Sequence, residues 1–271
     1  MKTLNNHSLI YDTDCPLCVG YTNAFTKYNL LDENGKKPFS KLTEEDKRTI
    51  DIHKASNEIA LINTKTKEVT YGVDSLLTIL GNSFPMISNI GNLKPFNYVL
   101  QKCYKFISYN RKVIITVKQT KHSCTPDFNL KYRWTYIIFC TLISSLILNQ
   151  YSNLLTSFIT KSSFTRELIM CSGQILFQGI VMYTLVKKRR LNYFGNMISI
   201  SFFGAIALIP ILIINHIFLV SEIFNIAYFG FVVCLMILEH KRRVTFLTLP
   251  IYLTLTWVLY RILWIPILLI H

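Results

Sequence analysis

The sequence predicts an α/β domain at the N-terminus, followed by an all-α transmembrane helical domain of about five spans. Residues 1–130 hold 17 Lys and Arg against 12 Asp and Glu, whereas residues 131–271 hold 12 against 3. In the second half the basic residues gather between long apolar runs, which is typical of membrane proteins. The first half instead alternates short β-prone runs with amphipathic segments. We therefore expect two domains, 1–126 and 127–271.

The first strand and the first helix are predicted by the stretch "SLIYDTDCPLCVGYTNAFTKYNLL". Residues 8–12 are β-prone, and apolar residues at steps of three and four predict a helix over 16–31. Pro16 suits the first helical position, where its missing N–H is not needed. The other expected elements are a strand at 39–42, a helix over 43–54 capped by Thr43, a hairpin of 59–62 and 68–71, a short helix at 73–80 and a longer one over 95–113.

The order strand, helix, strand, helix, strand, strand, helix is typical of a thioredoxin-like fold. Cys15 and Cys18 lie at the first junction of strand and helix. The start of a helix carries about half a positive charge, which favours the thiolate of Cys15 and makes it the attacking sulfur. Cys18 follows one turn later and can attack a mixed disulfide at Cys15, which releases the reduced substrate. The spacing therefore predicts a thiol–disulfide site.

Other interpretations of this pair remain open. His122 and Cys124 could join Cys15 and Cys18 in a Cys3His zinc site, although an H-x-C half-site is a weak signal. The two thiols could also be inert side chains of the core. Asp12 is a candidate proton acceptor for Cys18 through a water, or alternatively a turn residue that caps the helix.

The stretch "LIYDTDCPLCVGY" resembles the signature of the DCC family of thiol–disulfide oxidoreductases. The stretches "EIALINTKTKEVTYGVDSLLTIL" and "YKFISYNRKV" are similar to the family's hairpin with its glycine-led helix and to its closing aromatic and N-R segment. The resemblance covers about residues 8–115 and implies a thioredoxin-like fold with functional positions at Asp12, Cys15 and Cys18. The sequence departs from ordinary thioredoxins ahead of Glu58, where a proline that helps to hold a peptide substrate is absent.

Five apolar segments of the second half are long enough for membrane spans, since a span needs ~20 apolar residues. Basic residues cluster before the first segment, after the second and after the fourth, and such clusters favour the cytoplasmic side. The N-terminal domain is then cytoplasmic and the C-terminus lies outside. The expected spans are 133–152, 167–186, 194–214, 219–238 and 245–269.

Composition excludes several classes of protein. The seven cysteines are scattered, and no apolar signal-peptide segment opens the chain, which argues against a secreted disulfide framework. The bunched basic residues argue against a nucleic-acid partner. We expect no cofactor and no metal in the leading interpretation.

The leading hypothesis is a membrane-anchored thiol–disulfide oxidoreductase of the bacterial inner membrane, an origin that the family resemblance implies. Its expected partners are a protein or small-molecule disulfide acceptor, a cytoplasmic thiol reductant and the lipid bilayer. A second hypothesis is a non-catalytic zinc-binding or adaptor module that regulates a membrane partner. A third is transmembrane electron transfer, for which His216 is the only histidine that is a candidate to lie within a span.

Overall fold

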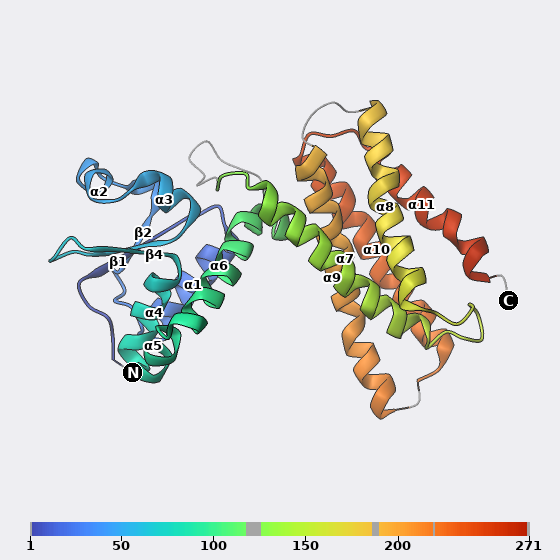
Figure 1. Cartoon of the computed structure of the whole chain (residues 1–271), viewed down its shortest axis with the longest axis horizontal. Helices are drawn as coiled ribbons and strands as arrows, with labels where there is room; N and C mark the ends of the chain where they lie inside the picture. The colour runs from blue at the N-terminus through green and yellow to red at the C-terminus, as the bar shows by residue number, and fades with distance from the viewer. Residues whose placement is uncertain (1, 118–125, 186–189, 219, 270–271) are drawn as a thin grey trace. The chain divides into compact units, whose positions relative to one another are not determined.

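The structure, a computed structural model, forms two compact units, Met1–Tyr132 and Arg133–His271 (Figure 1). The first unit is a mixed α/β domain, and the second is helical. This confirms the predicted class at that level. The residues that the structure describes are 2–117, 126–185, 190–218 and 220–269.

A four-stranded sheet lies at the centre of the first unit. Its strand order is β2-β1-β3-β4, with β1 parallel to β2 and the other two pairs antiparallel. The strand β1 therefore lies inside the sheet, with a neighbour on each side. The strands are β1 (His7–Tyr11), β2 (Lys36–Pro38), β3 (Ala60–Asn63) and β4 (Val69–Tyr71).

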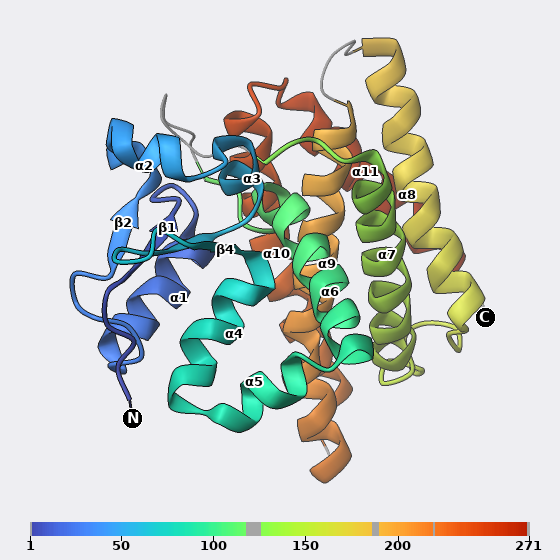
Figure 2. The same ribbon diagram turned by 60° about the vertical axis from the view of Figure 1, so that its left-hand side comes forward.

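Alternation along the central strands buries both faces of this sheet. Successive side chains of a strand point to opposite faces. Leu9 and Leu61 belong to one core with apolar residues of α1, α4 and α6, whereas Ile10 and Ala60 belong to a second core on the side of α2 and α3 (Figure 2). The helices of this unit are α1 (Pro16–Lys27), α2 (Glu44–Thr49), α3 (Ile52–Asn57), α4 (Gly72–Ser83), α5 (Pro85–Gly91) and α6 (Lys94–Ile114).

Three details differ from the predicted elements. The second strand ends at Pro38, so 39–42 is not a strand, and Phe39–Lys41 forms a short 3-10 turn. The helix predicted over 43–54 is two helices, because the Asp51 side chain accepts a hydrogen bond from the Lys54 N–H at 2.9 Å and starts a new helix. The third difference is α5, which has only seven residues and was not predicted.

Five helices make up the second unit, and the prediction of five membrane spans is wrong in number. Three of them are long and apolar enough to cross a membrane among the described residues: Leu191–Ile217, Glu222–Phe246 and Tyr252–Leu269. The expected spans 133–152 and 167–186 correspond to helices that fall short of this. The five helices are α7 (Leu130–Ser152), α8 (Phe164–Leu185), α9 (Arg190–Ile217), α10 (Glu222–Phe246) and α11 (Tyr252–Leu269).

Polar residues explain why α7 and α8 fall short. The helix α8 carries a buried Glu167 near its start, with Gln174 and Gln178 buried further along. In α7, the Tyr136 hydroxyl lies 2.7 Å from the Ser199 hydroxyl of α9. Such polar residues lower the hydropathy of α7 and α8, and those named here are buried within the helical unit.

Candidate functional site

The two cysteines of the C-x-x-C pair lie where the sequence places them, at the start of α1. The helix begins at Pro16, and Cys15 holds the position before it, with no side-chain hydrogen bond capping the helix. Both thiols are free, with 7 % of Cys15 and 4 % of Cys18 exposed. The structure therefore shows a reduced pair beneath the surface, with Cys15 the more exposed of the two.

The two thiols differ in their acidity. The pKa of Cys15 is lowered to about 6, first because the Cys18 thiol donates a hydrogen bond to its sulfur. Burial opposes this shift, while the Cys18 backbone N–H and the Arg111 guanidinium support it. The pKa of Cys18 is raised well above its ordinary value, because its proton is shared with Cys15 and because it is buried. Near neutral pH the pair therefore holds one thiolate, at Cys15, and one thiol.

Asp12 lies at the end of β1, buried beside this pair. One carboxylate oxygen accepts a hydrogen bond from the Asp14 N–H at 3.0 Å, and the other lies 3.8 Å from Nη2 of Arg111. The first contact belongs to the turn that leads into α1. The second leaves the carboxylate beside a cation and close enough to Cys15 to oppose its ionisation.

Arg111 of α6 is a site residue that the sequence interpretation did not assign. The side chain of Arg111 is 7 % exposed. Its guanidinium donates hydrogen bonds to the Ser56 carbonyl at 3.0 Å and to the Asn57 carbonyl at 3.4 Å. A buried arginine next to Asp12 and Cys15 supplies a fixed positive charge to the thiolate. The available signal was the N-R pair in "YKFISYNRKV", which was noted as part of the family pattern and not as part of the site.

The carbonyls that Arg111 contacts belong to a well-fixed segment just before β3. The Ser108 hydroxyl donates to the Asn57 carbonyl, and the Asn57 amide donates to Asp127 at 2.8 Å. Asp127 returns a backbone hydrogen bond to the Asn57 side chain at 2.7 Å. This segment therefore has the hydrogen bonds that a buried irregular backbone needs.

Two tyrosines complete the surroundings of Cys18. Tyr21 lies one turn further along α1, and burial, with Cys18 next in effect, raises its pKa well above the ordinary value. The Tyr104 hydroxyl of α6 accepts a hydrogen bond from the Ile59 N–H at 2.9 Å, and burial likewise raises its pKa. Both hydroxyls therefore stay protonated beside the thiols.

The zinc interpretation receives no support from the part of the chain that the structure describes. No group of three or more His, Cys, Asp or Glu residues is arranged to hold a metal ion there. His122 and Cys124, which that interpretation needs, lie outside the described residues.

His240 of α10 is a buried histidine that the sequence interpretation placed beyond the fourth span. Its Nδ1 lies 2.9 Å from the Thr254 hydroxyl, and the Tyr193 hydroxyl lies 3.3 Å from its Nε2. The ring also stacks on Trp257, with 5.1 Å between centroids. Both ring nitrogens thus have protein partners, so His240 is positioned to join α9, α10 and α11.

A reduced thiol pair at a helix start on a mixed sheet is the arrangement of a thiol–disulfide domain. Residues 9–116 match the family model described as DCC1-like thiol-disulfide oxidoreductase. This part of the chain is therefore similar to that family, as the resemblance predicted. No curated protein and no solved structure gives a significant match to the chain.

Proposed function

We propose that the protein is a membrane-anchored thiol–disulfide oxidoreductase whose thioredoxin-like domain works through Cys15 and Cys18. The observation that carries this proposal is the opposite shift of the two thiol pKa values, which provides one thiolate and one protonated thiol at the start of α1. The similarity of residues 9–116 to a thiol–disulfide family supports it.

In the proposed reaction, the Cys15 thiolate attacks one sulfur of a disulfide and expels the other half as a thiolate. Cys18 then loses its proton and attacks the Cys15 sulfur, which expels the second half. The protein ends with a Cys15–Cys18 disulfide, and the substrate has gained two electrons and two protons. The cytosol is reducing, so a thiol reductant would return the pair to the dithiol.

Arg111 and Asp12 have complementary roles in this proposal. Arg111 stabilises the thiolate at Cys15 before attack, because its positive charge favours the ionised sulfur. Asp12 is the proposed acceptor for the Cys18 proton in the second step, through a water. Its contact with Arg111 keeps the carboxylate buried near the thiols.

The location of the domain follows from the three candidate spans. The stretch Lys187 to Arg189 precedes α9, which begins at Arg190, and Lys241, Arg242 and Arg243 lie near the end of α10. If α9 and α10 both cross the bilayer, these two basic clusters lie on the same side, which the positive-inside bias assigns to the cytoplasm. We place the N-terminal domain on that side of a bacterial inner membrane, with the C-terminus outside.

The pH dependence of alkylation tests this function in the full chain in detergent. We expect the rate at which iodoacetamide modifies Cys15 to rise with pH as the thiolate forms, with a midpoint near pH 6. A midpoint for Cys15 near pH 8.5, the value of an unperturbed thiol, would contradict the proposal. The exposed Cys103 can also test on which side of the membrane the N-terminal domain lies. A membrane-impermeant maleimide should label Cys103 in permeabilised bacterial cells, and labelling in intact cells would contradict a cytoplasmic domain.

A further inference from the structure

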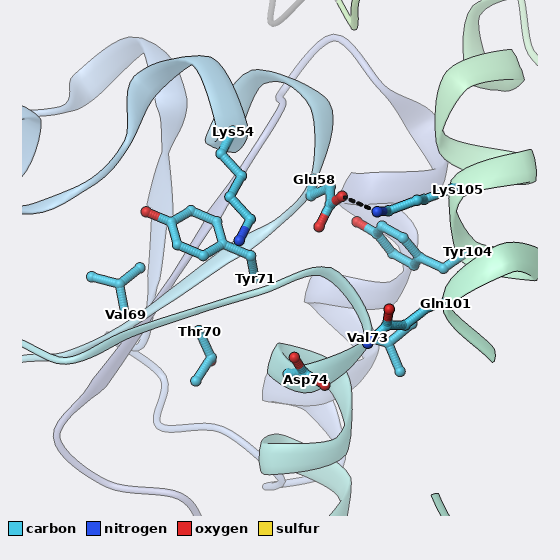
Figure 3. Close-up of a pocket in the computed structure, with 10 residues that line it drawn as sticks. All are labelled: Lys54, Glu58, Val69, Thr70, Tyr71, Val73, Asp74, Gln101, Tyr104 and Lys105. Atoms are coloured by element: carbon cyan, nitrogen blue, oxygen red, sulfur yellow. Dashed lines mark ion pairs between the residues drawn. The ribbon is translucent and has the colours of Figure 1, made fainter. Parts of the chain in front are cut away.

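A pocket of about 260 Å³ opens in the N-terminal unit (Figure 3). Three parts of the chain line it: the α3 segment that leads into β3, the junction of β4 with α4, and one side of α6. Ligand pockets in proteins begin at about 300 Å³, so this one suits a ligand of roughly amino-acid size. The charged and aromatic lining residues are Lys54, Glu58, Tyr71, Asp74, Tyr104 and Lys105.

Charges of both signs meet in this pocket. Lys54 lies with Nζ 4.4 Å from the centre of the Tyr71 ring, and Lys105 lies with Nζ 3.8 Å from Oε1 of Glu58. Figure 3 shows Glu58 and Lys105 directed towards each other, with the end of Lys54 beside the Tyr71 ring. Asp74, in the first turn of α4, adds a second carboxylate to the lining. The pocket can therefore offer ammonium groups to an anion and carboxylates to a cation at the same time.

Gly72 leaves the space that the Glu58 carboxylate occupies in this pocket. Its φ of +57° lies in the left-handed region, and a Cβ at this position would come within 2.7 Å of Oε2 of Glu58. Glycine adopts that conformation without steric cost. The turn from β4 into α4 thus leaves room for the carboxylate, whose side chain is only 14 % exposed.

The pocket and the thiol site share two structural parts. Tyr104 lines the pocket, and its hydroxyl accepts a hydrogen bond at 2.9 Å from the Ile59 N–H, next to the segment 56–58. The segment 56–58 supplies Glu58 to the pocket and two carbonyls to Arg111, which lies beside Asp12. A ligand held by Glu58 therefore lies against the same segment that holds Arg111, whose charge favours the Cys15 thiolate.

We propose that this pocket holds the charged end of a small zwitterionic disulfide, one that carries an ammonium and a carboxylate near its sulfur. This rests on the proposed function and names its substrate class. The carboxylate of the ligand pairs with Lys54 and Lys105, and its ammonium pairs with Glu58 and Asp74. The absence of the proline ahead of Glu58 agrees with a small-molecule substrate, since that residue helps thioredoxins to hold a peptide.

A single turnover of disulfide reduction by the Cys15–Cys18 dithiol needs no added reductant. The reduced pair gives two electrons and the proton of Cys18 to the disulfide, and water supplies the second proton. The disulfide becomes two thiols, and the protein becomes the Cys15–Cys18 disulfide. The Cys15–Cys18 pair therefore accounts for two released thiols per chain.

The test uses four small disulfides with the pre-reduced full chain in detergent. They are L-cystine, which is zwitterionic, cystamine, which is cationic, dithiodiglycolate, which is anionic, and hydroxyethyl disulfide, which is neutral. Each rate of thiol release is divided by the rate with 2-mercaptoethanol as the attacking thiol, so that intrinsic reactivity cancels. We expect the corrected rate for cystine to exceed that of the other three by about tenfold, since charged hydrogen bonds distinguish matched from unmatched groups by at least that factor.

Two variants of pocket residues test whether the preference for cystine arises in this pocket. Lys54→Gln and Asp74→Asn should each reduce the ratio of the cystine rate to the hydroxyethyl disulfide rate by about tenfold. Lys65→Gln and Glu33→Gln change exposed charges outside the pocket lining and serve as matched controls, with a ratio within twofold of the unmodified chain.

The possible outcomes separate this inference from the proposed function. Thiol release without a preference for cystine, or with a preference for a singly charged disulfide, overturns the inference and leaves the function standing. A cystine preference that survives both pocket variants overturns the assignment to this pocket. No thiol release from any of the four disulfides contradicts the proposed function itself.

Discussion

Replacing Cys15 with serine is expected to abolish thiol release from hydroxyethyl disulfide, with a loss of at least a thousandfold in the single-turnover rate. The reason is that the attacking thiolate is gone, and Cys18 cannot replace it because it is only 4 % exposed and its burial still opposes ionisation. Replacing Cys18 with serine should instead release one thiol and leave the other half of the reagent on Cys15 as a mixed disulfide. Intact mass of the full chain distinguishes the two results directly.

The control for this pair is Cys103→Ser, which removes an exposed free cysteine of α6. It should leave both the rate and the number of released thiols unchanged. A mixed disulfide that accumulates on Cys18 in the Cys15→Ser chain would show that the roles of the two sulfurs are reversed from our assignment.

Replacing Arg111 with glutamine is expected to raise the alkylation midpoint of Cys15 above about pH 6 and to loosen the segment before β3. The midpoint rises because the guanidinium charge no longer favours the thiolate. The segment loosens because Arg111 donates to the Ser56 and Asn57 carbonyls and lies beside the buried Asp12. Removing one partner of a buried ion pair costs about 3 kcal/mol, which corresponds to about a hundredfold faster amide exchange in this segment.

Hydrogen–deuterium exchange, read on peptides that cover 52–63, measures the loosening of the segment before β3. Alkylation of Cys15 as a function of pH measures the change in its midpoint. Lys102→Gln, at an exposed position of the same helix, is the matched control, and it should change neither by more than the equivalent of about 0.5 kcal/mol. An unchanged Cys15 midpoint in Arg111→Gln would mean that the guanidinium has only a structural role.

The N-terminal fold was predictable at the level of element order, because its signals are local. Alternating apolar residues around Leu9 and Leu61 determine the central strands, and Thr43 caps a helix through a capping box. The second strand was misplaced because its register depends on pairing with β1, where Tyr11 lies opposite Pro38. Pairing of this kind joins residues far apart in the chain, which a local pattern does not report.

The site was predictable only for residues next to each other in sequence. Cys15 and Cys18 lie on one helical turn, and Asp12 precedes them, so a short motif contains all three. Arg111 reaches them from α6, about a hundred residues later, through contacts that only the folded chain creates. The number of spans was overestimated for a related reason: apolar stretches in α7 and α8 indicated spans, while their polar residues, such as Glu167 and Ser144, are buried inside the helical unit.

The measurement that tests the central claim most directly is a redox titration of the full chain in detergent, read by intact mass, with zinc measured on the same sample. The account predicts a reversible loss of two hydrogens on oxidation, present in Cys103→Ser and absent in both Cys15→Ser and Cys18→Ser. Stoichiometric zinc with no reversible two-hydrogen change would contradict it and would favour a metal-binding module instead.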